Sequence, residues 1–334
     1  RNASRLSSEI TSERALVSFE KLSDLFGIHD EHLRYLEEIF GVKIFPAEGG
    51  LDLRGEGPQV GRAQRFLEEI SSILEQGCPL EGGDLRALAR SFAEGDERPL
   101  SEFADWRIEV STKRRFVIPK SPAQRLYVQS IRNYDIVFGI GPAGTGKTYL
   151  AMAMAVSGLL GKHFSRIILV RPAVEAGEKL GFLPGDLLEK INPYLRPLYD
   201  ALYDMLEYEK IQKFMERGAI EVAPLAYMRG RTLNDSFIIL DEAQNSTVEQ
   251  MKMFLTRLGF SSKAVVTGDI TQVDLLDERG SGLVQAMSVL GDVEDIRFVH
   301  FSERDVVRHP LVREIIKAYE KHEGAQAPRG SRRR

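Results

Sequence analysis

Residues 141–148 read Gly-Pro-Ala-Gly-Thr-Gly-Lys-Thr. They match the pattern G-x-x-x-x-G-K-[ST], and they stand between an apolar run at residues 136–140 and an apolar helical pattern at residues 149–160. This strand–loop–helix context distinguishes a phosphate-binding P-loop from a plain glycine turn between a buried strand and a helix. The segment therefore predicts a nucleoside triphosphate site.

The loop residues have separate expected roles in holding the nucleotide. The three glycines let the backbone turn tightly and direct its N–H groups at phosphate oxygens, in front of the positive end of the next helix. The Lys147 side chain is expected to reach the β- and γ-phosphates, and the Thr148 hydroxyl to ligate Mg²⁺. The expected nucleotide-binding residues are Gly141, Pro142, Ala143, Gly144, Thr145, Gly146, Lys147 and Thr148.

A second apolar run ends in two acids. Residues 237–242 read Phe-Ile-Ile-Leu-Asp-Glu, which has the form of a Walker B motif. Asp241, at the carboxyl end of the expected strand, would hold Mg²⁺ through its water shell. Glu242 would orient and polarise the attacking water. The alternative is a strand followed by a helix whose N-terminus these acids cap.

A third expected strand ends in a polar segment. Residues 264–274 read Ala-Val-Val-Thr-Gly-Asp-Ile-Thr-Gln-Val-Asp. If this strand adjoins the P-loop strand, Thr267 and Gln272 lie beside the γ-phosphate, and Gln272 can sense it and shift a loop. The alternative is a polar turn capped by Asp269.

Gln124 and several arginines are further candidates. The Gln124 amide carries a donor and an acceptor and can read the adenine edge, which predicts ATP; the alternative is an exposed helix-start glutamine. A transition-state cation is often an arginine, and Arg308 is preferred over Arg304, against a structural ion pair. Arg171 is expected to meet nucleic acid or to support the core.

Bulk composition restricts the class of protein. The chain of 334 residues carries a net charge of -4, so any nucleic-acid binding must use local patches. Its single cysteine, Cys78, excludes an internal disulfide framework and fits a reducing compartment. No apolar run is long enough to span a membrane and no signal core opens the sequence, so we expect a cytoplasmic protein without membrane contact.

The chain divides into segments of different pattern. Residues 1–14 are read as an extension, 15–76 as a small β-α-β-β-α domain, 77–115 as a linker, 116–323 as the P-loop domain and 324–334 as a disordered basic tail. Strands are expected at residues 135–139, 166–170, 219–222, 237–240, 264–267 and 297–300. Their apolar runs lack alternation, which predicts a mostly parallel sheet with helices on both faces. The fold class is α/β, a RecA-like P-loop domain beside a small α+β domain.

Together the motifs resemble the PhoH family of P-loop ATPases, of the bacterial YbeZ-like type. The resemblance rests on the P-loop, Arg171-Pro172, Leu-Gly-Phe-Leu-Pro-Gly-Asp at 180–186, Asp-Glu-Ala-Gln-Asn at 241–245, residues 267–274, and Asp-Val-Val-Arg-His-Pro-Leu-Val at 305–312. It covers most of residues 116–322. It implies an RNA-linked ATPase, sometimes with helicase activity, that works with a YbeY-type endoribonuclease in ribosomal RNA processing.

The resemblance also implies that the N-terminal domain is KH-like. The Gly-x-x-Gly clamp of an RNA-binding KH domain would fall at residues 27–30, where the second glycine is absent. This departure favours a packing or oligomerisation module. RNA contacts are expected instead from residues 175–217, where tyrosines stand among cations, and from residues 227–231. Because residues 175–217 also hold acids, the alternative there is a mixed-charge helical face.

Assembly is expected from the length of the P-loop domain. Only 67 residues (334 − 267) follow Thr267, too few for a second RecA-like domain. We therefore expect a homo-oligomer, a hexameric ring, in which Arg308 reaches a neighbour's ATP. The leading function is an ATP-driven RNA remodelling motor. The alternatives are an ATP-gated adaptor that recruits a nuclease without unwinding, and a nucleotide kinase, which Glu242 and Gln272 disfavour.

Overall fold

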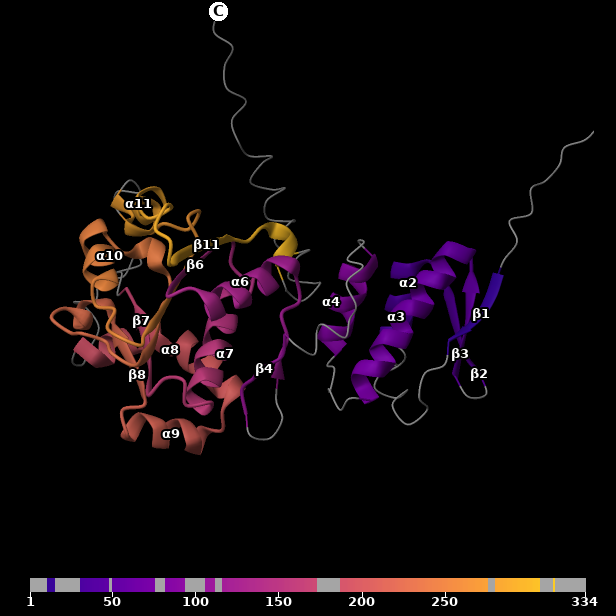
Figure 1. Ribbon diagram of the computed structural model, residues 1–334, viewed down its shortest axis with the longest axis horizontal. Helices are drawn as coiled ribbons and strands as arrows, with labels where there is room; N and C mark the ends of the chain where they lie inside the picture. The colour runs from indigo at the N-terminus through magenta and orange to yellow at the C-terminus, as the bar shows by residue number, and fades with distance from the viewer. Residues whose placement is uncertain are drawn as a thin grey trace, which may run out of the picture. The chain divides into compact units, whose positions relative to one another are not determined.

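The chain forms two units, Arg1–Val128 and Gln129–Arg334, and each is described by itself. The computed structural model describes residues 11–15, 31–47, 50–75, 82–93, 106–111, 116–172, 187–275, 280–306 and 315 (Figure 1). None of the helices in these ranges combines the length and the apolar character that a membrane span needs.

The first unit contains a three-stranded antiparallel sheet with helices packed on it. The strands are β1 (Thr11–Ala15), β2 (Lys43–Ala47) and β3 (Gly50–Gly55), in the order β1-β3-β2. The helices are α2 (Glu31–Phe40), α3 (Gly57–Glu75) and α4 (Gly82–Ala93), and β4 (Ile108–Glu109) pairs with β5 (Phe116–Val117). The expected β-α-β-β-α order places two strands side by side at residues 42–45 and 51–53, and the pairing of β2 with β3 confirms that hairpin. The first strand, expected at residues 15–20, begins earlier, because residues 11–15 pair with β3; residues 16–20 lie outside the described residues.

A cluster of aromatic rings forms the core of this unit. Phe66 of α3 is fully buried, and its ring centroid lies 5.1 Å from that of Phe40 and 5.6 Å from that of Phe92. Phe92 belongs to α4, within the stretch read as a linker, and Leu85 and Leu88 of the same helix join the core. The apolar face of α4 therefore packs with α2 and α3 in one hydrophobic cluster.

The second unit is built on a six-stranded parallel sheet in the order β11-β6-β10-β9-β7-β8. All six strands expected from the sequence are confirmed. They are β6 (Ile136–Ile140), β7 (Arg166–Arg171), β8 (Ile220–Pro224), β9 (Ser236–Leu240), β10 (Lys263–Gly268) and β11 (Ile296–His300). Strand β10 lies between the P-loop strand β6 and the Walker B strand β9.

Helices cover both faces of this sheet, as the unalternating strands predict. Every residue of β9 is buried, and Ile238 and Leu240 pack with Met251 and Phe254 of α10 (Val248–Leu255) and with α11 (Gly282–Val289). The other face meets α7 (Lys147–Leu160), and Phe164 just beyond that helix packs edge-on against Phe237. Helices α6 (Pro122–Asn133), α8 (Leu187–Met205) and α9 (Tyr208–Glu216) complete the helices of the described chain (Figure 1). The α/β P-loop fold is thus confirmed.

Candidate nucleotide-binding site

The P-loop connects β6 to α7 through backbone conformations that favour glycine. Gly144 and Gly146 both have φ of 81°, and Gly146 is the N-cap of α7. Gly141 has φ of 150°, and a Cβ atom there would lie 2.5 Å from the carbonyl oxygen of Phe301. A side chain at position 141 would therefore push the loop away from the end of β11.

Lys147 folds back over its own loop. Its Nζ donates to the carbonyl oxygens of Gly141, at 2.6 Å, and Pro142, at 2.7 Å, and to Oγ1 of Thr145, at 3.3 Å. Burial lowers the pKa of the Lys147 ammonium, while the carboxylates of Asp269, Glu242 and Asp241 raise it. The ammonium is thus held in a water-poor loop beside three carboxylates, and together with the loop N–H groups it supplies the positive charge that a phosphate needs there.

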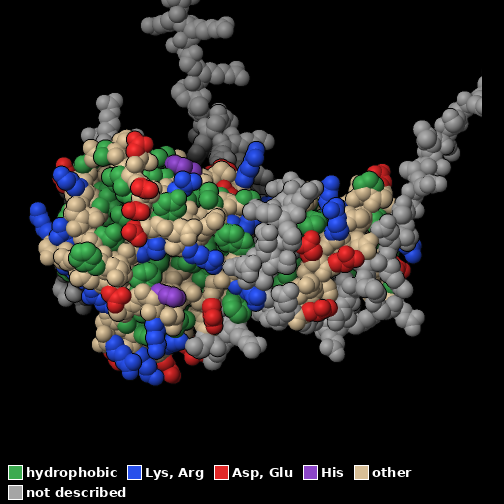
Figure 2. Space-filling view, in the orientation of Figure 1, with side chains coloured by type: hydrophobic (Ala, Val, Ile, Leu, Met, Phe, Trp, Pro, Cys, Tyr) green, Lys and Arg blue, Asp and Glu red, His purple; other side chains and the backbone are tan. Residues whose placement is uncertain are grey.

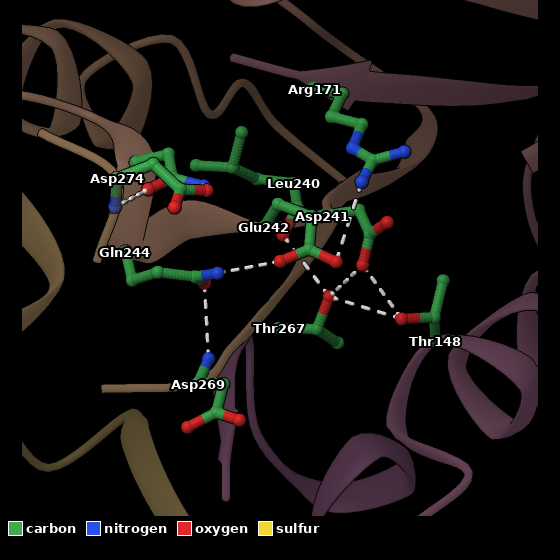
Figure 3. A network of polar contacts seen from close by, with 10 residues as sticks. Thr148, Arg171, Leu240, Asp241, Glu242, Gln244, Thr267, Asp269 and Asp274 are labelled. Atoms are coloured by element: carbon green, nitrogen blue, oxygen red, sulfur yellow. Dashed lines mark hydrogen bonds and ion pairs between the residues drawn. The ribbon is translucent and has the colours of Figure 1, made fainter. Parts of the chain in front are cut away.

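Asp241 joins three segments of the fold (Figure 3). Its Oδ1 accepts a hydrogen bond from the Thr148 hydroxyl at 2.6 Å and from the Thr267 hydroxyl at 2.7 Å. Asp241 is 6% exposed and Thr267 is fully buried. These hard oxygen donors suit Mg²⁺, which binds one or two protein oxygens and keeps most of its waters. The residues that the sequence assigns to Mg²⁺ are therefore in direct contact.

Glu242 follows Asp241 in a strained backbone conformation. Its φ of 53° and ψ of 41° place it in the left-handed region, which costs a non-glycine residue about 1–3 kcal/mol. One carboxylate oxygen lies 3.4 Å from Nη2 of Arg171, and the other accepts from Nε2 of Gln244 at 2.5 Å. The carboxylate is thus oriented by its side-chain contacts on two sides (Figure 3).

The helix after the Walker B strand is capped by a different residue. Thr247 is the N-cap of α10, and it forms a capping box with Gln250. A short 3-10 turn, Ala243–Asn245, separates Asp241 and Glu242 from that cap. The alternative in which these acids cap the helix is therefore wrong.

The end of β10 lies next to the P-loop strand, as the sensor hypothesis requires. Gly268 pairs with Ile140, and its carbonyl oxygen accepts from the Gly141 N–H at 3.1 Å. Asp269 Oδ1 caps the following turn, accepting from the Thr271 N–H and hydroxyl at 2.9 and 2.6 Å. Gln272 is exposed beyond this turn, and its N–H donates to the Asp269 carbonyl at 3.1 Å. Its role as a γ-phosphate sensor stays a prediction.

Gln124 and Arg308 are the other two residues that the sequence assigns to the site. Gln124 is 4% exposed, and its Oε1 accepts from the Lys120 N–H at 2.5 Å at the start of α6. That contact places Gln124 at a helix start, but its burial contradicts the exposed glutamine of the alternative, and the adenine-reading role remains a prediction. Arg308 lies outside the described residues, whereas Arg304 is exposed in a 3-10 turn, Glu303–Asp305.

The sequence reasoning missed two contacts with Glu242. Arg171 is expected from the sequence to meet nucleic acid or the core, but the pairing of β7 with β9 brings it to the carboxylate of Glu242. Gln244 belongs to the Asp-Glu-Ala-Gln-Asn motif, in which the sequence predicts a role only for the two acids. Its proximity to Glu242, two residues away, was the available signal.

The expected RNA-contacting stretches lie partly within the described chain. Tyr203 at the end of α8 stacks on Tyr208 at the start of α9, with centroids 5.7 Å apart, and Tyr208 is 63% exposed. Arg231 makes a bidentate ion pair with Glu221, at 2.6 and 2.7 Å, which occupies one of the cations in residues 227–231. The residue range 173–186 lies outside the described residues.

Comparisons with known proteins find close relatives. Residues 116–320 match the family model described as PhoH-like protein. A PhoH-like protein of Mycobacterium bovis is 52% identical over 313 residues, which cover 92% of this chain and 88% of the relative. A PhoH-like protein of Bacillus subtilis is 46% identical over 297 residues, covering 89% of this chain and 93% of the relative. Among solved structures, a Sulfolobus solfataricus SWI2/SNF2 ATPase core in complex with dsDNA matches 48% of this chain and 35% of its own at 16% identity and a TM-score of 0.31, which adds nothing to the fold described above.

The contact between Thr267 and Asp241 predicts a measurable loss of stability. Thr267→Val keeps the shape of a buried side chain but removes a hydroxyl that donates to a buried carboxylate. We expect the free energy of unfolding to fall by about 1.5–3 kcal/mol, measured by chemical denaturation. The matched control is Thr256→Val, at an exposed helix end, with an expected change below about 0.5 kcal/mol. Equal losses of unfolding free energy in the two variants would contradict a stabilising role of the Thr267–Asp241 hydrogen bond.

Proposed function

This chain belongs to the PhoH family, and from that membership and the site geometry we propose that it is a Mg²⁺-dependent ATPase that couples hydrolysis to RNA remodelling. The observation that carries the proposal is the meeting of Thr148, Asp241 and Thr267, with Glu242 beside them at the carboxyl edge of the sheet. That edge is where ligands bind in open α/β sheets.

The chain's residues divide the chemical work in the proposed reaction. Lys147 exchanges its carbonyl partners for phosphate oxygens, and the glycine-rich turn supplies N–H donors to the same phosphates. Thr148 and Asp241 would hold Mg²⁺, and the ion would supply positive charge against the charge that develops on the phosphates. Glu242 accepts a proton from the attacking water, or orients that water toward the γ-phosphate. A nucleotide kinase would need the phosphate of a second nucleotide as acceptor in place of the water that Glu242 suits.

RNA is the proposed polymeric partner. Lys and Arg side chains gather over α9 in Figure 2, and α9 carries Lys210 and Lys213 with Arg217 at its end. The exposed Tyr203–Tyr208 stack lies at the start of the same helix. Tyr227 is 44% exposed after β8, at the P-loop edge of the sheet. Bases stack on exposed aromatic rings while cations neutralise phosphates, so these features support single-stranded RNA.

We also propose the assembly and the cellular setting. Among the described residues, the cations at the site are Lys147, on its own loop, and Arg171, paired with Glu242. A neighbouring copy that delivers Arg308 would add a transition-state cation, which favours a cyclic homo-oligomer, a hexamer by our expectation. We propose that the protein acts in the cytoplasm, where it takes part in ribosomal RNA processing together with a YbeY-type endoribonuclease.

Two substitutions test the proposed hydrolysis. Lys147→Ala removes the cation that meets the phosphates, so both nucleotide binding and turnover are expected to be lost. Glu242→Gln keeps nucleotide binding and lowers kcat by at least about 100-fold, because an amide cannot accept the proton. Binding is measured with a fluorescent ATP analogue, and turnover by phosphate release with Mg²⁺. The control is Glu249→Gln, an exposed acid in the first turn of α10, with unchanged kcat. Full turnover by the Lys147→Ala protein would refute the site.

RNA coupling is tested at the tyrosine stack. We expect single-stranded RNA to raise kcat for ATP and Tyr208→Ala to weaken RNA binding by at least about fivefold, since stacking contributes about 1–3 kcal/mol per base. Phe260→Ala is the control, because Phe260 is an aromatic residue exposed to 89%. Equal RNA affinities of the wild type and the Tyr208→Ala variant would remove this surface from the proposal. ATP hydrolysis without duplex unwinding, together with ATP-dependent capture of the endoribonuclease, would favour the adaptor.

Assembly and the arginine are tested together. Native mass measurement with ATP and Mg²⁺ is expected to give a closed oligomer. Glu242→Gln and Arg308→Ala proteins, each inactive alone, should regain hydrolysis when mixed, because one copy supplies Arg308 to an intact Glu242 in its neighbour. A monomer under all nucleotide conditions, or no recovery on mixing, would reject the shared site.

A further inference from the structure

The Gln244 side chain uses both ends of its amide inside the site. Its Nε2 donates to Oε2 of Glu242 at 2.5 Å, and its Oε1 accepts from the N–H of Asp269 at 3.0 Å (Figure 3). Gln244 is 1% exposed. One buried side chain therefore connects the carboxylate after β9 to the backbone after β10.

The partners determine which way the amide faces. A backbone N–H can only donate, so the amide oxygen must point to Asp269. A carboxylate accepts, so the amide NH₂ must point to Glu242. A glutamine is thus suited to this position because it has one donor end and one acceptor end.

Packing holds the amide in place. A Cβ at Gly268 would lie 2.8 Å from Oε1 of Gln244 and 2.5 Å from Cδ2 of Leu283, so the glycine leaves room for the amide. The Ser281 hydroxyl donates to the Gln244 carbonyl oxygen at 2.9 Å and fixes its backbone. A side chain fixed by its neighbours in this way can transmit a displacement from one partner to the other.

The segment at the acceptor end forms a turn. Asp269 Oδ1 holds the N–H and the hydroxyl of Thr271, and the Asp269 carbonyl holds the N–H of Gln272. The other carboxylate oxygen, Oδ2, is buried and has no hydrogen-bond partner among the described residues. A displacement of this turn would move the Asp269 N–H, and with it the Gln244 amide.

We propose that Gln244 is a positioning residue that transmits the position of the Asp269–Gln272 turn to the carboxylate of Glu242. The inference rests on the proposed ATP hydrolysis, in which this turn lies beside the γ-phosphate. The Glu242 side chain is 37% exposed, so the two side-chain contacts orient its carboxylate. Arg171 meets one oxygen and Gln244 directs the other.

Two substitutions separate positioning from simple bracing. Gln244→Met keeps the length of the side chain and loses both hydrogen bonds. Gln244→Glu keeps an acceptor for the Asp269 N–H but places a carboxylate against Glu242. If Gln244 only braces the turn, Gln244→Glu should behave like the wild type. If it positions Glu242, both variants should lose at least about tenfold in kcat, with the KM for ATP changed by less than about twofold.

A matched control lies in the same 3-10 turn. Asn245 is also a buried amide, but its side chain bonds Asp274, accepting from the Asp274 N–H at 2.9 Å; towards Glu242 only the Asn245 backbone N–H donates, to the carbonyl oxygen at 3.0 Å and not to the carboxylate. Asn245→Leu should keep kcat within about threefold of the wild type while losing comparable thermal stability. Thermal unfolding of all variants, with ATP-analogue binding, establishes that each is folded.

The outcomes distinguish this inference from the proposed function. If either folded variant, Gln244→Met or Gln244→Glu, keeps the kcat of the wild type, the positioning role is overturned. The proposal of ATP hydrolysis is not affected by that result. Equal losses in Gln244→Met and Asn245→Leu also overturn it, because the effect would then belong to the turn as a whole. Absence of Mg²⁺-dependent hydrolysis in the wild-type protein overturns the proposed function and the inference together.

Discussion

The carboxylate of Asp241 is the point on which the geometry of the site depends. It is buried, and a buried carboxylate is tolerated when hydrogen bonds replace its lost water. Its bonds come from Thr148, at the start of α7, and from Thr267, near the end of β10. Both donors can reach Asp241 only because β10 lies between β6 and β9. The order of the strands therefore determines which hydroxyl groups can bond the Asp241 carboxylate.

The backbone around this point adopts conformations that an unconstrained chain avoids. Glu242 takes a left-handed conformation without being glycine, and Gly141 approaches the carbonyl of Phe301 too closely for any side chain. Such strain persists where surrounding contacts hold it, and it tends to occur at functional sites. Here the contacts of Arg171 and Gln244 with the Glu242 carboxylate are among those that hold it. The contacts that orient the Glu242 carboxylate thus also help to hold its strained backbone.

Much of the second unit could be predicted from the sequence because its signals are local. Each strand is a short apolar run bounded by turns, and the P-loop and the Asp241-Glu242 pair stand at the ends of such runs. The contact of Arg171 with Glu242 could not be predicted, because it arises from the register of β7 on β9. The packing of α4 into the N-terminal core was hidden by the glycines and prolines around it, although its helical pattern was visible. Hydrophobic pattern determines elements, whereas strand register and rotamers determine which polar groups meet.

The position of Lys147 connects this geometry to nucleotide binding. In the described structure its ammonium bonds neutral carbonyl oxygens of its own loop, and burial lowers its pKa. A phosphate group brings full negative charge to the same place, and a nearby negative charge raises the pKa of an ammonium. The existing bonds already have a charged donor, and a phosphate adds a charged acceptor, so the attraction between opposite charges favours the exchange of carbonyl for phosphate. The same exchange releases the carbonyls of Gly141 and Pro142, which frees the P-loop to adjust against the end of β10. In the proposed reaction, nucleotide binding at Lys147 would thereby act on the turn at Asp269, and through Gln244 on Glu242, without any contact between the nucleotide and Gln244 itself.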